Sequence, residues 1–322
     1  MTERRDILYL SEDDLAGLGI STADATRAIE DMFHGRAAGK VWWAPKASVM
    51  PGDGRFMMAT LAVADEPPVM TVKSLLLAPD NGERGLPRLN SVINVMDGVT
   101  GLPLATMDGN WITAVRTAAL SAVAAKHLAR EYAAVAGFVG CGVQARSHLE
   151  AFASMFPLRE IRVFGRGRAN IDALCAAAGE LGLSSVVCED GETVLNEADL
   201  ITTSVTFSDG VEPFLDAARM KPGSFAAITD LAAPWLRDSF ASLDRVIIDD
   251  LDQEAAMEAK LADPSLVHGD LSGLVLGKVQ GRGAATDRAA FVFRGHAIGD
   301  LALSALAYQR AVGSGKGTRI KA

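Results

Sequence analysis

The sequence has few cysteines and lacks long apolar runs. Its 322 residues include three cysteines, Cys141, Cys175 and Cys188, without a CxxC pair or a Cys/His spacing typical of a metal site. Such usage favours free thiols in a reducing compartment and gives no reason to expect a metal. Because no run of about 18 apolar residues and no signal-peptide pattern is visible, we expect a cytoplasmic protein without a membrane span.

An excess of basic residues is also missing. The chain has 31 Lys+Arg against 40 Asp+Glu, a net charge of −9, which argues against a general nucleic-acid binder. Hydrophobic residues make up 49%, enough for a large core and too many for a disordered chain. The length predicts two domains.

The first part of the chain predicts an α+β domain. A short strand at Ile7–Leu10 precedes two helices that begin after Ser11 and Ser21. Between residues 40 and 110, short apolar runs alternate with Gly, Asn and Pro turns, which predicts antiparallel strands. An Ala-rich helix should follow from about Ile112 to Leu128.

Residues 135–300 alternate strand and helix patterns, which predicts a doubly wound parallel sheet. We place the domain boundary near 130, giving domains 1–130 and 131–297. The C-terminal segment 298–322, a helix with a Gly-rich and mobile tail, is expected to return to the first domain.

A glycine turn is the clearest motif. Gly140-Cys-Gly142-Val143-Gln144-Ala145 is a GxGxxA sequence between an apolar strand and a helix. Gly140 permits the tight turn, Gly142 the approach of a diphosphate, and Ala145 close helix packing. The sequence therefore predicts a Rossmann-type domain that binds a dinucleotide, with Val143 and Gln144 at the cofactor.

Other strand ends at the same edge should also contact the dinucleotide. The strand that follows the turn ends in Phe164-Gly-Arg166-Gly-Arg168, without the carboxylate that holds an NAD ribose. Two guanidinium groups there favour the 2′-phosphate of NADP, although NAD stays open. A later strand ends at Thr203 and Ser204, which we also expect at the cofactor.

The first domain contains four cations in unusual places. Lys73 lies inside the apolar run Val69–Leu77, and Arg116 lies inside the Ala-rich helix. A charge in an apolar segment is costly unless it is paired or functional. Lys46 and Arg88 lie in turns and are better explained by solvent exposure.

These segments together resemble the ornithine cyclodeaminase/mu-crystallin family over nearly the whole chain. The resemblance is carried by Thr71-Val-Lys73-Ser, Gly85-Leu-Pro87, Asp97–Ala105, Asp108-Gly-Asn-Trp-Ile-Thr-Ala-Val-Arg116-Thr-Ala-Ala, Gly140–Ala145 and Gly295-His-Ala-Ile-Gly-Asp300. Membership implies a homodimer whose N-terminal substrate domain forms the interface, with a Rossmann domain that binds NAD(P).

The resemblance also implies residue roles. Arg116 would bind the substrate carboxylate, Lys73 would act as acid or base, and Thr117 would touch the cofactor. Lys46 stands where an Arg for the same carboxylate is usual.

Two positions depart from the family pattern. Where cyclodeaminases have a catalytic Asp before Pro234, this chain has Ala232, with Asp230 two residues earlier. Arg88 replaces a small hydroxyl residue, which suggests a substrate with a second negative charge.

We therefore expect an NAD(P)H-dependent imine reductase that forms an L-amino acid, favouring a dicarboxylic imine such as iminosuccinate. Lys73 and Asp230 are the candidate catalytic residues, and Lys46, Arg88, Arg116 and His296 the substrate-binding ones. The alternatives are a cyclodeaminase-type lyase that uses bound NAD, a monocarboxylic ketimine reductase or alanine dehydrogenase, and a mu-crystallin-like ligand-binding protein.

Overall fold

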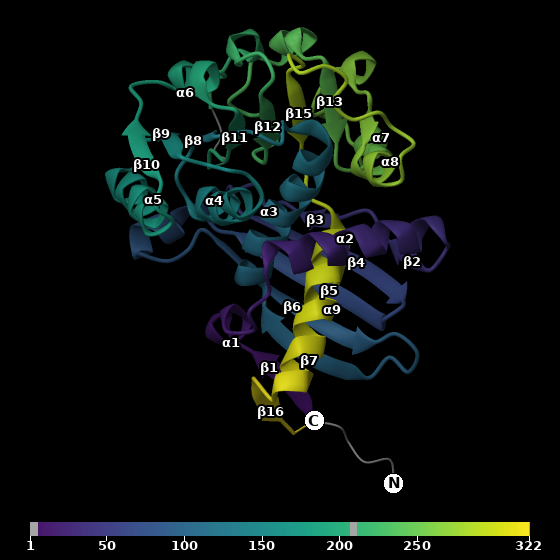
Figure 1. Cartoon of the computed structure of the whole chain (residues 1–322). Helices are drawn as coiled ribbons and strands as arrows, with labels where there is room; N and C mark the ends of the chain where they lie inside the picture. Colours follow the sequence, from purple (N-terminus) through teal and green to yellow (C-terminus); the bar gives the residue numbers. More distant parts are fainter. Residues whose placement is uncertain (1–5, 207–210, 322) are drawn as a thin grey trace. The chain divides into compact units, whose positions relative to one another are not determined.

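The computed structural model describes residues 6–206 and 211–321 and divides into two compact units (Figure 1). The first unit contains the residues up to Arg116 and those from Ala297 onward, and the second contains Thr117–His296. The division falls inside helix α3 (Gly109–Leu128), earlier than the expected position near residue 130. The Ala-rich sequence continues as one helix, so the chain passes from one unit to the other without a linker.

The first unit is built on a mixed sheet. Its strands run in the order β16-β1-β7-β6-β5-β4-β2, and β3 also pairs with β4. Neighbours are antiparallel except β1 and β7, as the alternating runs and turns predict. The strands are β1 (Ile7–Leu10), β2 (Val41–Trp43), β3 (Ala47–Val49), β4 (Phe56–Asp65), β5 (Pro68–Leu77), β6 (Leu89–Asp97), β7 (Pro103–Asp108) and β16 (Thr318–Ile320).

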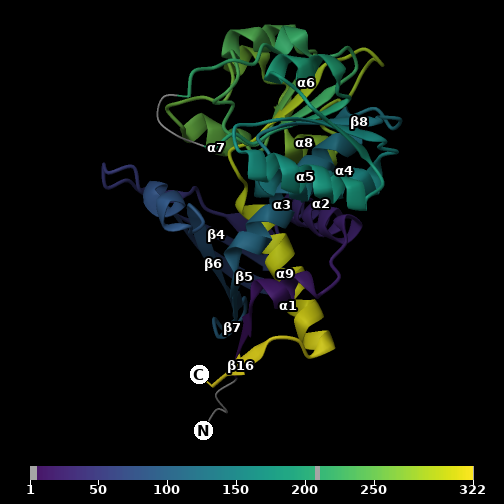
Figure 2. The same ribbon diagram turned by 90° about the vertical axis from the view of Figure 1, so that its left-hand side faces the viewer.

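Helices cover one face of this sheet. Capping boxes at Ser11 and Ser21 begin α1 (Glu12–Ala16) and α2 (Thr22–Ala37), where each serine accepts from the amide three residues on. Helix α9 (Ala297–Ser314) lies along β4, β5 and α2 (Figure 2). A short 3-10 helix, η1 (Pro79–Arg84), connects β5 to β6. Inward-facing residues of the strands therefore pack against α9, and the alternate residues face away from it.

The Gly-rich tail differs from the expected mobile segment. After α9 the chain turns at Gly315 and Gly317, both at positive φ, and forms β16 beside β1. A Cβ at Gly317 would lie 2.8 Å from the Tyr9 carbonyl oxygen, so only glycine allows this close approach. Backbone pairing with an edge strand thus orders a segment whose composition suggests disorder.

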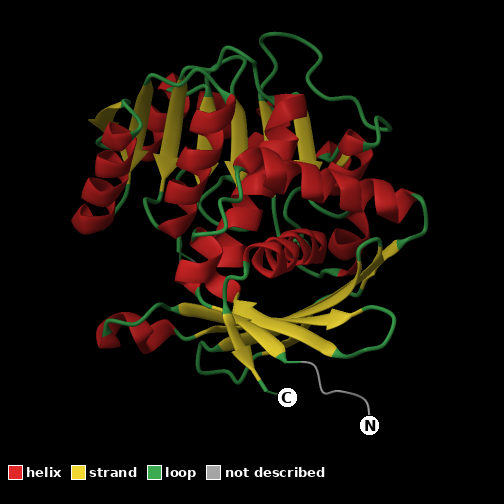
Figure 3. Ribbon diagram, turned by 60° about the horizontal axis from the view of Figure 1, so that its bottom comes forward, coloured by secondary structure: helices red, strands yellow, loops and turns green. Residues whose placement is uncertain are grey.

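The second unit contains a parallel sheet, which confirms the expected fold class. Its strand order is β10-β9-β8-β11-β12-β15-β13-β14 (Figure 1). Figure 3 draws these strands in yellow and the helices in red. The strands are β8 (Val135–Val139), β9 (Glu160–Phe164), β10 (Ser184–Val187), β11 (Leu200–Thr203), β12 (Phe225–Ile228), β13 (Arg245–Ile248), β14 (Gly269–Asp270) and β15 (Ala289–Val292). Because β8 lies between β9 and β11, the order reverses at its carboxyl end, where doubly wound folds bind ligands.

Short helices connect these strands: α4 (Val143–Met155), α5 (Arg168–Glu180), α6 (Gly191–Glu197), α7 (Leu251–Ala256), α8 (Leu271–Val275), η2 (Ala217–Arg219), η3 (Arg237–Ser242) and η4 (Pro264–Leu266). Apolar side chains from β11, β12, β13 and β15 form a continuous buried core with Trp235 and Phe240. Within the two described ranges, no helix has the length and apolar character needed to cross a bilayer.

Candidate functional site

Lys73 is buried in the first unit. The alternation of β5 places Thr71, Lys73 and Leu75 on the face that α9 covers, and Lys73 is 1% exposed. Its Nζ donates to Oδ1 of Asp300 on α9 at 2.9 Å. The charge that the sequence places in an apolar run is therefore paired rather than directed to solvent.

Asp300 connects this lysine to Arg116. The same Oδ1 accepts from Arg116 Nε at 3.0 Å, while Oδ2 accepts from the Thr60 hydroxyl on β4 at 3.2 Å. All four side chains are buried. One carboxylate thus binds two cations, and a pairing of this kind is what makes buried charge tolerable.

This environment changes proton affinities. Burial lowers the pKa of Lys73 to about 8, with Arg116 and Lys46 acting in the same direction and Asp300 opposing them. Burial alone would raise the pKa of Asp300, but the charges of Lys73 and Arg116 hold it below its usual value. Lys73 can therefore give up a proton close to neutral pH, and the cluster keeps a net positive charge suited to an anionic ligand.

The other two predicted substrate-binding cations of this unit lie in different places. Lys46, between β2 and β3, is half-buried and close enough to Lys73 to affect its pKa. Arg88 is exposed just before β6, with its Nε 3.0 Å from where a Cβ of Gly82 would lie. Leu89 pairs with Leu77 and Ile93 with Lys73, so the backbone at Arg88 lies about 15 Å along the sheet from Lys73.

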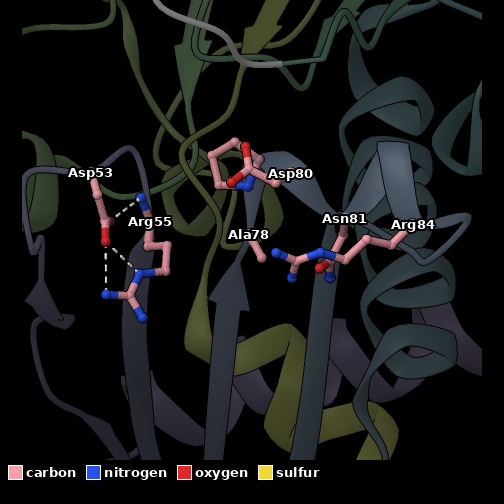
Figure 4. Close-up of a pocket in the computed structure, with 7 residues that line it drawn as sticks. Asp53, Arg55, Ala78, Asp80, Asn81 and Arg84 are labelled. Carbon is pink, nitrogen blue, oxygen red and sulfur yellow. Dashed lines mark hydrogen bonds and ion pairs between the residues drawn. The ribbon is translucent and has the colours of Figure 1, made fainter.

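A polar cavity of about 290 Å³ lies next to η1 at this end of the sheet (Figure 4). Its lining residues are Asp53, Arg55, Ala78, Pro79, Asp80, Asn81 and Arg84. Arg55 pairs with Asp53 at 2.7 Å. The cavity therefore presents both charge signs and is separate from the buried Lys73 cluster.

The glycine turn of the second unit has the geometry of a diphosphate site. Gly140 has a φ of 90°, and a Cβ there would lie 2.6 Å from the Ser204 carbonyl oxygen. Gly142 has an ordinary φ, and no described protein atom lies within 4 Å of where its Cβ would be. The backbone conformation and close packing therefore require glycine at position 140. They do not require it at position 142, where the missing side chain leaves space for a ligand.

Helix α4 begins directly after this turn. No side chain in the described part of the chain caps its first amides. Buried Ala145 allows the helix to approach the sheet, and Val143 is exposed at its start. Free amides and the positive end of the helix dipole suit a diphosphate, so these residues fit a nicotinamide dinucleotide.

Asp230, which follows β12, accepts hydrogen bonds from the end of β11 and from the segment just after it. Its Oδ1 accepts from the Thr203 hydroxyl at 3.1 Å and its Oδ2 from the Val205 amide at 3.0 Å. Burial raises its pKa to about 6, against the effect of these hydrogen bonds. Leu231 and Ala232 follow at φ 58° and 56°, a strained pair for non-glycine residues. The segment is held in a sparsely populated conformation, as is common at functional loops.

The remaining predicted residues are placed as follows. Ser204 donates to the Gly140 carbonyl at 3.2 Å, which ties its loop to the glycine turn. Thr117 is buried on α3, and His296 is buried with its Nε2 3.5 Å from Asp250 Oδ2. Arg168 pairs with Asp172 at 2.9 Å, whereas Arg166 is exposed after β9.

Asp300 is not among the residues that the sequence predicts for the site. The signal was present, since Asp300 is an acidic residue in the apolar helical sequence Ala-Ile-Gly-Asp-Leu-Ala-Leu. The same argument that selected Lys73 and Arg116 applies to it. The described part of the chain brings together no group of His, Cys, Asp and Glu side chains suited to a metal ion.

Comparisons with known proteins agree with these observations. The model of the ornithine cyclodeaminase/mu-crystallin family matches residues 12–315. The Δ1-pyrroline-2-carboxylate reductase of Thermococcus litoralis, solved with NADH and L-proline, is 26% identical with a TM-score of 0.90, covering 98% of this chain and 100% of that one.

Two further structures match at 25% identity. An archaeal alanine dehydrogenase dimer with bound NAD has a TM-score of 0.86 and covers 98% of this chain and 99% of its own. The iminosuccinate reductase of Paracoccus denitrificans with NAD+ has a TM-score of 0.83 and covers 99% and 100%.

Proposed function

This chain belongs to the ornithine cyclodeaminase/mu-crystallin family, and from that premise we propose that it is an NAD(P)H-dependent oxidoreductase that reduces a small 2-imino acid to an L-amino acid. The observation that carries the proposal is the buried Lys73–Asp300–Arg116 cluster, which combines a proton donor with a carboxylate-binding guanidinium. The similar reductases and dehydrogenases support the same type of reaction.

The residues of the first unit would bind and protonate the substrate. Arg116 and Lys46 would together bind the α-carboxylate of the imino acid. Lys73 Nζ would give its proton to the imine nitrogen and is left as a neutral amine. Holding the substrate carboxylate fixes the imine carbon in one orientation, and such orientation can contribute several kcal/mol to catalysis.

The second unit would hold the cofactor. Gly140, Gly142, Val143 and Gln144 would contact the diphosphate, with Thr117, Thr203 and Ser204 also at the cofactor. When bound, the reduced nicotinamide supplies the hydride that the imine carbon accepts. Asp230, held by Thr203 at the end of β11, would orient substrate or water near the nicotinamide, and His296 would assist in binding substrate.

For the substrate we propose a dicarboxylic imine, iminosuccinate, with aspartate as the product. Similarity to an iminosuccinate reductase supports this choice, and the exposed guanidinium of Arg88 is the proposed partner of the distal carboxylate. A monocarboxylic or cyclic imine is the second candidate, favoured by the similar pyrroline-2-carboxylate reductase and alanine dehydrogenase.

The test is oxidation of NADH and NADPH at 340 nm with oxaloacetate plus ammonia, beside pyruvate plus ammonia and a cyclic ketimine. Turnover with oxaloacetate and ammonia alone supports iminosuccinate reduction. Turnover only with the other substrates keeps the reductase and removes the dicarboxylic proposal. Release of ammonia from ornithine with catalytic NAD, or tight coenzyme binding without any turnover, would replace the proposal with the lyase or the binding protein.

The same assay tests coenzyme preference. We propose that Arg166 favours NADPH, because it is exposed at the end of β9 while Arg168 is already paired with Asp172. Substitution Arg166→Ala should then raise the KM for NADPH and leave that for NADH nearly unchanged. A parent enzyme that binds NADH more tightly would contradict this proposal.

We also propose a homodimer. The face of the first-unit sheet opposite α9 carries exposed apolar residues on adjacent strands: Met57, Leu61, Met70, Leu76 and Val92. We call this set the outer sheet patch. A contiguous apolar surface of this kind is typical of an interface, and a similar alanine dehydrogenase is a dimer.

A further inference from the structure

Asp300 is shared between two cations in an unusual way. Lys73 and Arg116 both bind Oδ1, and the Thr60 hydroxyl binds the other oxygen. Thr60 is directly opposite Lys73 on β4, so the carboxylate is fixed from two strands and one helix. Both oxygens of this carboxylate are therefore engaged by residues of the same unit.

We propose that Asp300 is the positioning residue that keeps the Lys73 ammonium protonated and directed for proton transfer. The inference rests on the proposed reductase activity, in which Lys73 is the acid. Asp300 itself touches neither substrate nor cofactor in this scheme. Its function is to supply the counter-charge without which a buried lysine beside an arginine would lose its proton.

The surroundings of Lys73 explain why this counter-charge is needed. Arg116 of α3 and Asp300 of α9 lie next to Lys73, and the charge of Lys46, in the segment after β2, also acts on it. Strand β4 contributes uncharged Thr60 and β6 contributes apolar Ile93. Two positive charges and burial lower the Lys73 pKa, and the charge of Asp300 opposes all three.

The kinetic test is the pH profile of kcat with a stable cyclic ketimine or with oxaloacetate and ammonia. In the parent protein, activity should fall as the pH rises past about 8, because Lys73 loses its proton. In Asp300→Asn the fall should begin about 1–3 pH units lower, since the opposite charge is gone and the shape is kept. Activity should recover when the pH is lowered.

Two controls separate charge from packing. Asp300→Glu keeps the charge. The alkaline limb of its pH profile, where kcat falls as the pH rises, should therefore stay near that of the parent although kcat decreases. Ser304→Ala removes a buried hydroxyl one turn further along α9 and should not move the limb. An alkaline limb in Asp300→Asn that coincides with the parent, with kcat lower at every pH, would show a merely structural role. A shift of the limb in Ser304→Ala would overturn the proposal as well.

A second measurement does not depend on activity. A lysine whose folded pKa is depressed destabilises the protein at low pH, and the penalty disappears as the pH rises from its folded to its unfolded pKa. The difference in unfolding free energy between the parent and Lys73→Met should therefore increase above about pH 8. In the Asp300→Asn background the increase should begin at a lower pH.

This second measurement distinguishes the two failures. If no imine is reduced but the onset moves as expected, the proposed function is wrong and the role of Asp300 holds. If imines are reduced and the onset does not move, the inference fails alone. If Asp300→Asn fails to fold, the pH profile of the charge-retaining Asp300→Glu decides. A shift of its alkaline limb would overturn the inference about Asp300, and an unshifted limb would support that inference.

Discussion

At the scale of single residues, Lys73 carries the proton-transfer hypothesis. Lys73→Met keeps the apolar stem and removes the ammonium, so we expect kcat to fall about 10²- to 10⁴-fold. The cofactor should bind as before, because the glycine turn lies elsewhere in the chain. Steady-state kinetics and NADPH fluorescence titration measure the two effects.

The matched control is Lys40→Met, which removes an exposed lysine of the same unit that pairs with Glu66. It should leave kcat within a factor of two, since exposed ion pairs contribute little. A near-normal kcat in Lys73→Met would remove this lysine from the chemistry.

Arg88 tests the substrate proposal. Arg88→Thr should reduce kcat/KM about 10- to 100-fold for oxaloacetate with ammonia and far less for pyruvate with ammonia, because a charged hydrogen bond is lost only with the former. Arg84→Thr, a neighbouring exposed arginine at the cavity, is the comparison. Equal losses on both substrates would contradict a distal carboxylate at Arg88.

At this scale the sequence reveals the charges that interrupt apolar runs, but it does not reveal the carboxylate that they share. Lys73 and Arg116 stand out because their immediate neighbours are apolar. Asp300 forms its contacts across 227 and 184 positions of the chain, and no local pattern records such a pairing. The position of Arg88 at the exposed end of β6 likewise depends on strand register, which the sequence does not specify.

At the scale of elements, we expect the two glycines of the turn between β8 and α4 to have different roles: Gly140 is needed for folding and Gly142 for binding the coenzyme. Gly140→Ala should lose stability on the order of 1–3 kcal/mol, because its positive φ and contact with the Ser204 carbonyl do not admit a Cβ. Gly142→Ala meets no described protein atom, so it should fold normally and bind NADPH more weakly. Thermal unfolding and coenzyme titration give the two readings.

The outcome that contradicts this assignment is a Gly142→Ala protein with unchanged coenzyme affinity. A Gly140→Ala protein as stable as the parent would equally contradict the strain argument.

Elements with strong local signals were predictable. The serine caps, the antiparallel runs and the βα repeat agree with the structure to within a few residues. Strand β15 carries no strong local signal, because Ala289-Ala-Phe-Val is short and alanine favours helices. Strand β16 also lacks a local signal. It forms only by pairing with β1, and the glycine-rich sequence of the tail does not indicate that pairing.

At the scale of the whole molecule, the outer sheet patch predicts an assembly. Leu61, on β4, belongs to this patch and is 46% exposed. The substitution Leu61→Asp should convert a dimer to a monomer, because it places an unpaired charge in the interface. Sedimentation or light scattering at micromolar concentration measures this. The control is Leu181→Asp, an equally exposed leucine at the end of α5.

A parent protein that is monomeric at that concentration would refute the homodimer. A Leu61→Asp protein that stays dimeric would move the interface away from the patch.

The 227 positions that separate Lys73 from Asp300 have a consequence during synthesis. At about 5–20 residues per second, a ribosome needs about 10–45 s to translate that interval. Lys73 lacks its counter-charge throughout this interval, and Arg116 lacks it over the last 184 positions, so the first unit cannot bury both cations with their partner. The second unit, whose residues are continuous from Thr117 to His296, is complete before α9 emerges. The order of translation therefore leaves the charge-bearing core of the first unit to be closed last.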